Sequence, residues 1–106
     1  MIQEKLLGQL RPSSTSAEVV YSVPSETTAI VKSILVSNVS ALGMKYSIFV
    51  SEGTTYDEST AIAWNCILAK ENSIVINLFV SLTQGNIAFK VDTSSSATIT
   101  LMGVEV

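Results

Sequence analysis

Short segments in which apolar and polar residues alternate run through this sequence and limit what it can fold into. The clearest is MKYSIFVSE, residues 44–52, where every second residue from Met44 to Val50 is apolar or aromatic. A period of two places these side chains on one face of an extended strand, whereas a helix repeats its apolar face every three or four residues. The segment therefore predicts a half-buried strand, and no stretch of the chain shows a helical apolar period.

Similar segments recur along the chain and are separated by turn residues such as Pro24-Ser25 and Gln84-Gly85-Asn86. Short, evenly spaced strands of this kind are typical of sandwiches and jelly rolls. We predict an all-β protein with a single β-sandwich or jelly-roll-like domain of about eight antiparallel strands. Beside 44–52, the segments that read as strands are 17–23, 27–39, 60–69, 72–82, 86–92 and 97–106.

Three of these strands give specific predictions of which side chains share a face. In the strand at 27–39, one face holds Ile30, Ile34 and Val36 and the other holds Val31, Ser33, Leu35 and Ser37. Both faces are partly apolar, as in a strand that is covered on two sides. The other two strands predict core faces made of Ile62, Trp64, Cys66 and Leu68, and of Ile74, Ile76, Leu78, Val80 and Leu82.

The first eleven residues are set apart from the rest of the chain. Pro12 and a run of Ser and Thr up to residue 16 break the pattern after them, so they read as an arm or an edge strand. We accordingly divide the chain into an N-terminal arm and linker at 1–16 and a β-sandwich domain at 17–106. The apolar side chains of the arm are candidates for contact with a neighbouring subunit; they are Ile2, Leu6, Leu7 and Leu10.

The surface is predicted to be rich in hydroxyl and amide groups and poor in charge. Only 14% of the 106 residues are charged, against roughly 25% in an average soluble domain. Such a surface suits close packing against other proteins, because few ions must be desolvated. The six basic residues are scattered singly and the net charge is -3, which argues against nucleic acid and an anionic membrane as partners.

Two further features concern membranes and export. The most hydrophobic stretch, 73–82, is interrupted by Asn77 and is too short to span a bilayer. The N-terminus lacks the charged start and continuous apolar segment of a secretory signal, so export by the general pathway is not predicted.

The chemistry that most enzymes use is missing from the sequence. The chain has no histidine, so the Ser-His-Asp and Cys-His arrangements cannot be assembled and the commonest nitrogen ligand for metals is lacking. The single cysteine, Cys66, lies in an apolar run and reads as a small core residue. We predict a protein that is not an enzyme and has no catalytic residue, no metal and no cofactor.

One loop offers an alternative. Glu52, Tyr56 and Asp57 follow the strand at 44–52 and could bind a glycan through an exposed aromatic ring and carboxylates, or hold Ca²⁺ through oxygen ligands. A solvated acidic turn explains the same residues, and their spacing matches no known calcium loop. A carbohydrate-binding module is therefore kept as an alternative function.

Several short motifs resemble a group of small structural proteins of tailed bacteriophages. That group is similar to this chain in a "GQL-x-P" element, a "Y-x-VP" element, a strand that ends in "SN-x-S" and a closing G-[VS]-E. In this sequence the matching residues are Gly8, Gln9, Leu10, Pro12, Tyr21, Val23, Pro24, Ser37, Asn38, Ser40, Gly103, Val104 and Glu105. The resemblance spans nearly the whole chain, departs from the group at 52–60, and rests on turn and strand residues rather than on a site.

The resemblance implies a non-enzymatic virion protein that is assembled in the host bacterial cytoplasm. It favours a capsid decoration or cement protein that stabilises the shell, with copies of itself (a homo-oligomer such as a trimer) and the major capsid protein or other virion proteins as partners. A tail, baseplate or fibre-associated subunit is the alternative within the same class. The stretch SIVINLFVSL has no Lys or Pro to guard it as an edge strand, so we expect a partner to cover it.

Overall fold

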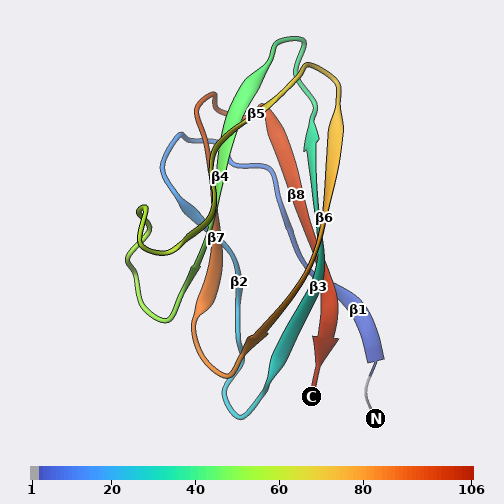
Figure 1. The fold of residues 1–106 in the computed structure, drawn as a ribbon, viewed down its shortest axis with the longest axis vertical. Coiled ribbons are helices and arrows are strands. Elements are labelled where there is room, and N and C mark those ends of the chain that lie inside the picture. The colour runs from blue at the N-terminus through green and yellow to red at the C-terminus, as the bar shows by residue number, and fades with distance from the viewer. Residues whose placement is uncertain (1–2) are drawn as a thin grey trace.

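The fold is described here from a computed structural model, which covers residues 3–106. Over this range the chain forms eight strands and no helix, and so it contains no helix long and apolar enough to cross a membrane (Figure 1). The strands are β1 Gln3–Leu10, β2 Glu18–Ser22, β3 Ala29–Asn38, β4 Met44–Ser51, β5 Ala61–Leu68, β6 Ser73–Leu82, β7 Asn86–Val91 and β8 Ala97–Glu105.

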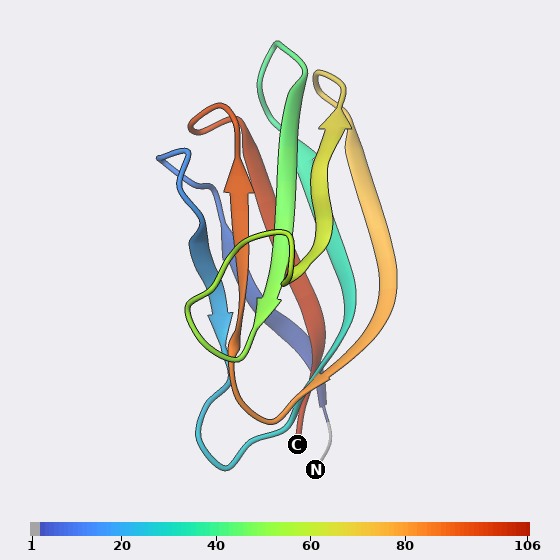
Figure 2. The same cartoon turned by 60° about the vertical axis from the view of Figure 1, so that its left-hand side comes forward.

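The strands form two packed antiparallel sheets, ordered β1-β8-β3-β6 and β2-β7-β4-β5. Strand β1 pairs with β8, β2 with β7, β3 with β6 and β4 with β5, so the chain is one long hairpin whose two halves are rolled up together. Every connection except the β4–β5 turn crosses from one sheet to the other, as Figures 1 and 2 show. This strand order is that of a jelly roll, and it confirms the predicted fold class.

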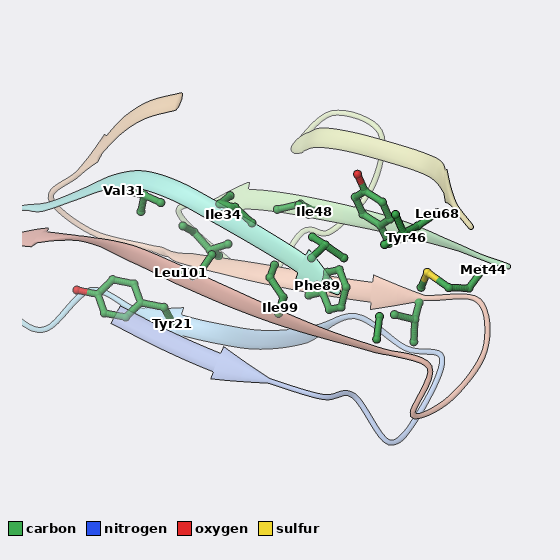
Figure 3. Close-up of a cluster of buried hydrophobic side chains, with 14 of the residues drawn as sticks. Tyr21, Val31, Ile34, Met44, Tyr46, Ile48, Leu68, Phe89, Ile99 and Leu101 are labelled. Atoms are coloured by element: carbon green, nitrogen blue, oxygen red, sulfur yellow. The ribbon is translucent and has the colours of Figure 1, made fainter. Parts of the chain in front are cut away.

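The core lies between the two sheets. Phe89 of β7 and Leu101 of β8 are both fully buried in it, and the rings of Phe89 and Tyr46 are 6.2 Å apart (Figure 3). Met44 and Leu68 close one end and Tyr21 lies at the other. These side chains come from β2, β4, β5, β7 and β8, so burial of apolar area joins the two sheets into one folding unit.

A line of β-bulges crosses the β1-β8-β3-β6 sheet at one level. The register shifts between Leu6 and Gly8 on β1, and between Val31 and Ser33 on β3, where the pairings with both β8 and β6 change. A bulge adds a residue to one strand and bends it. Because of the bulge on β3, Val31 points into the core on the same side as Ile34 and is fully buried. The sequence-based prediction that Val31 and Ile34 lie on different faces of the strand was wrong.

Strand β5 departs from the predicted alternation for the same reason. Asn65 has a positive φ of 48°, and its N–H donates to the Ser47 hydroxyl at 3.0 Å, where the β4–β5 register shifts. Cys66 and Leu68 face the core as predicted, but Ile62 and Trp64 do not. Trp64 is half-exposed and meets the ring of Phe49 edge-on, with a centroid distance of 6.1 Å, so the prediction that it is a core residue was wrong.

Gly103 of β8 sits beside the bulge on β3, where there is no room for a side chain. A Cβ atom placed there would lie 2.0 Å from the carbonyl oxygen of Ile30. We expect Gly103→Ala to lower the free energy of unfolding by about 2 kcal/mol or more, because backbone must move to admit the methyl group. Urea denaturation measures this, with Gly53→Ala as the control, since nothing lies within 4 Å of a Cβ there. Equal stability of the two variants would contradict the predicted close approach.

Candidate docking surface

Each open sheet has two edge strands, which here are β1, β6, β2 and β5. Strand β1 carries Glu4 and Lys5, and β2 begins with Glu18; both also contain a register shift. Strand β5 has two register shifts against β4. Charges and bulges are the features by which natural sheets prevent pairing with other chains.

Strand β6 lacks protection by charge, although its pairing with β3 also shifts register between Val80 and Asn77. Its ten residues include no charged residue and no proline, and its side chains alternate between half-buried and exposed from Asn77 to Val80. Val75 and Phe79 project outward and are 56% and 72% exposed. Within residues 3–106 its only paired neighbour is β3, so one row of its backbone groups faces solvent.

The outward side of the β1-β8-β3-β6 sheet, termed the outer face below, is apolar and weakly charged. The register places Leu6, Met102 and Ser33 in one row and Leu35 beside Val75 in another. Leu6 is 55% exposed and Met102 is 39% exposed. Glu4 and Lys32 on this face pair with each other at 2.7 Å, and the neighbouring Lys5 pairs with Glu105. This arrangement can bury apolar area against a partner with little cost of ion desolvation.

The line of bulges leaves an open hollow of about 450 Å³ in the outer face. Its lining residues come from β1, β3 and β8 and are Glu4, Lys5, Leu6, Lys32, Ser33, Met102 and Gly103. The hollow was not predicted from the sequence, although glycine inside a strand, as at Gly8 and Gly103, is a known signal of a bulge or a close backbone approach. The outer face is thus bent and can receive a protruding group.

The predicted contact residues of the N-terminal segment fall in different places. Residues 3–10 form the edge strand β1, one of the two forms expected for this segment. Leu6 lies on the outer face, whereas Leu7 and Leu10 are half-buried and contact the core. Ile2 lies outside the described residues. Of this set, Leu6 is the side chain that the structure places on an exposed surface.

The polar groups of the predicted ligand loop bond to their own neighbours. The Tyr56 hydroxyl donates to Asn86 Oδ1 at 2.8 Å, and its ring lies 6.0 Å from that of Phe49. Gln84 Nε2 donates to a Glu52 oxygen at 2.9 Å. Asp57 Oδ1 accepts hydrogen bonds from the Ser59 hydroxyl and, at 2.9 Å, from the Ser59 N–H, and these two bonds lower the pKa of Asp57.

No cluster of three or more His, Cys, Asp or Glu side chains suited to a metal occurs within residues 3–106. The glycan and calcium hypotheses for this loop stay predictions.

The residues that carry the phage resemblance have structural roles. The buried Asn38 amide donates to the Leu42 and Leu68 carbonyl oxygens at 2.9 and 3.1 Å and so ties the β3–β4 loop to the end of β5. Pro12 is buried, and its carbonyl oxygen accepts the Ser95 N–H at 2.7 Å. The motifs therefore specify loop and sheet contacts of the fold.

The Tyr21–Glu105 contact joins the two sheets at one end of the core. The Tyr21 hydroxyl donates to Glu105 Oε2 at 2.5 Å, and Lys5 forms an ion pair with the same carboxylate. The bonds from Lys5 and Tyr21 lower the pKa of Glu105, and burial together with the bond to Glu105 raises the pKa of Tyr21. Three strands, β1, β2 and β8, meet in this contact.

No family model matches the sequence, and no curated protein is similar to it. Among solved structures, the chain is similar to structures of infectious bursal disease virus. A chain of the Gx strain has a TM-score of 0.46 and 11% identity, and one of the Gt strain has 0.40 and 12%. The matches cover 100% and 99% of this chain but 32% of each viral chain, so this chain spans about a third of their length.

The Glu105 contact gives a prediction for acid stability. A lowered pKa in the folded state means that the carboxylate stabilises the fold above its unfolded pKa, near 4.5, and that this contribution is lost as the pH falls through the folded pKa. Glu105→Gln should therefore lower the thermal midpoint at pH 7, and the difference from wild type should shrink below about pH 4. Thermal unfolding followed by circular dichroism between pH 2.5 and 7 measures this. With Glu58→Gln as the exposed-loop control, a pH-independent difference for Glu105→Gln would refute the assignment.

Proposed function

We propose that this protein is a non-enzymatic structural component of a bacteriophage virion, and that it decorates or cements the capsid. The outer face is the single observation that supports this most, because an apolar surface whose charged residues form ion pairs is suited to adhesion. The motif resemblance supports the bacteriophage class. The lack of histidine in the sequence supports a role without catalysis.

The mechanism proposed is adhesion to the shell through many copies. Burying about 300 Å² of apolar surface yields about 7 kcal/mol before the costs of association are subtracted. Those costs are about 4–15 kcal/mol, so one such contact is weak. Copies that also contact one another bind the shell together with much higher avidity. Leu6 and Met102 lie beside the hollow and are the proposed centre of the shell contact.

A capsid-binding measurement tests the proposal. We expect Leu6→Lys to reduce occupancy on purified shells at least tenfold, because the ammonium group must be desolvated in the contact. Leu42→Lys is the matched control, since Leu42 is exposed in the β3–β4 loop, away from the outer face. These two single substitutions are preferable to deleting residues 2–11, which would remove strand β1 and two core contacts.

The same particles can be used to locate the protein. Binding to shells that is unchanged in Leu6→Lys would overturn the role of the outer face. Binding to tails but not to shells would overturn decoration and support the tail-associated alternative that the resemblance also allows.

A further inference from the structure

The exposed edge strand β6 is nearly palindromic in residue character. Reading outward in both directions from Asn77, the sequence SIVINLFVS at residues 73–81 meets residues of the same kind at every step. The pairs at equal distance from Asn77 are Ile76 and Leu78, Val75 and Phe79, Ile74 and Val80, and Ser73 and Ser81. Such symmetry is what a strand needs in order to pair with a copy of itself, because an antiparallel two-fold pairing brings these residues face to face.

We propose that β6 pairs antiparallel with β6 of a second copy of this chain, with Asn77 of one copy opposite Asn77 of the other. The two sheets then become one continuous sheet in the order β1-β8-β3-β6-β6-β3-β8-β1. The partner is a second copy rather than another protein because the strand is complementary to itself in this register.

The side-chain exposure in β6 agrees with this register. Val75 and Phe79 both project from the outer face. In the proposed pairing, Val75 of each copy lies opposite Phe79 of the other copy. Opposed aromatic and β-branched side chains are favourable cross-strand pairs. The two Asn77 amides meet at the two-fold axis, where side-chain amides can donate to and accept from each other.

The inward side chains of β6 give a second, independent reason. Ile34 and Val36 on β3 are fully buried, but their partners on β6 are not: Ile76 is half-buried and Ile74 is 40% exposed. Leu78, further along β6, is also only half-buried. The sandwich is therefore incompletely closed along this side, where β6 lies at the edge of one sheet and β5 at the edge of the other (Figure 2). A second copy would cover these side chains and would also satisfy the free backbone groups of β6.

This inference names the contact that would supply the self-association in the proposed function, but it does not require a virus particle. It can therefore be tested on the purified protein alone, and its failure would leave the shell contact of the outer face untouched. A trimer, which the resemblance allows, would need a contact between two different surfaces, whereas this pairing uses the same surface twice.

Sedimentation equilibrium of the purified chain tests the pairing. We expect a monomer–dimer equilibrium in the wild type, and at least a tenfold rise in its dissociation constant in Phe79→Lys, because a lysine on an edge strand blocks pairing. Phe79 is 72% exposed, so the variant should fold. The control is Leu42→Lys, because Leu42 is 76% exposed and lies in the β3–β4 loop, outside β6. This variant should leave the monomer–dimer equilibrium unchanged. A wild type that stays monomeric at millimolar concentration, a trimer, or a dimer indifferent to Phe79→Lys would overturn the proposal.

Cross-linking tests the register. In a Cys66→Ser background, Asn77→Cys would bring two thiols together at the two-fold axis, with Cβ atoms about 4.5–5.5 Å apart. A short bis-maleimide should join them into a covalent dimer. Ser73→Cys is the matched control on the same strand, because the two cysteines would lie eight residue steps apart, about 27 Å. Cross-linking of Ser73→Cys that equals or exceeds that of Asn77→Cys would refute this register.

Discussion

The structure depends on how its edge strands deal with the backbone N–H and C=O groups that have no neighbouring strand to bond to. A sandwich of two open sheets buries its core between the layers but leaves an unpaired row of N–H and C=O groups along each outer strand. Strands β1, β2 and β5 carry charges or bulges that hinder pairing with another chain. Strand β6 carries no charge, and its pairing with β3 shifts register only between Val80 and Asn77, although β6 and β3 are the two longest strands, with ten residues each. A long edge strand that is uncharged and apolar either promotes aggregation or forms an interface with a partner.

The bulges that bend one sheet connect the fold to the surface. They turn Val31 into the core, bring the backbone of β3 against Gly103 and open the hollow beside Leu6 and Met102. The energy of core packing therefore holds the outer face in a bent shape, and a partner would meet a surface that is already formed. Such preorganisation lowers the ordering cost of association. The Tyr21–Glu105–Lys5 contact holds β1, and hence Leu6, against the rest of the sandwich.

Much of the fold could be predicted from the sequence, because the period of two and the turn residues survive in nearly every strand. The alternation in β4 and β6 gave the correct core faces for Met44, Ile48 and Leu82. The errors fell where a single extra residue changes the face of all that follows, as at Lys32 in β3 and near Asn65 in β5. Bulges depend on pairing partners far along the chain, so local periodicity cannot reveal them.

The candidate surface was less predictable than the fold. The unguarded composition of β6 is visible in the sequence, but its position at an edge depends on the order of strands in the sheet. Leu6, Leu7 and Leu10 look alike in the sequence, and the β1 bulge decides that Leu6 faces outward while the other two contact the core. For the loop at 52–60, the sequence showed the side chains but not their bonds to Asn86, Gln84 and Ser59.

Hydrogen exchange of the β6 amides tests most directly whether this edge is an interface. Amides that point towards β3 are bonded in a single copy, whereas those that point outward are protected only if a second strand pairs with them. The account predicts that peptides covering residues 73–82 exchange more slowly at high protein concentration than at low, while those covering β5 do not change. Exchange in β6 that is equally fast at every concentration would contradict it.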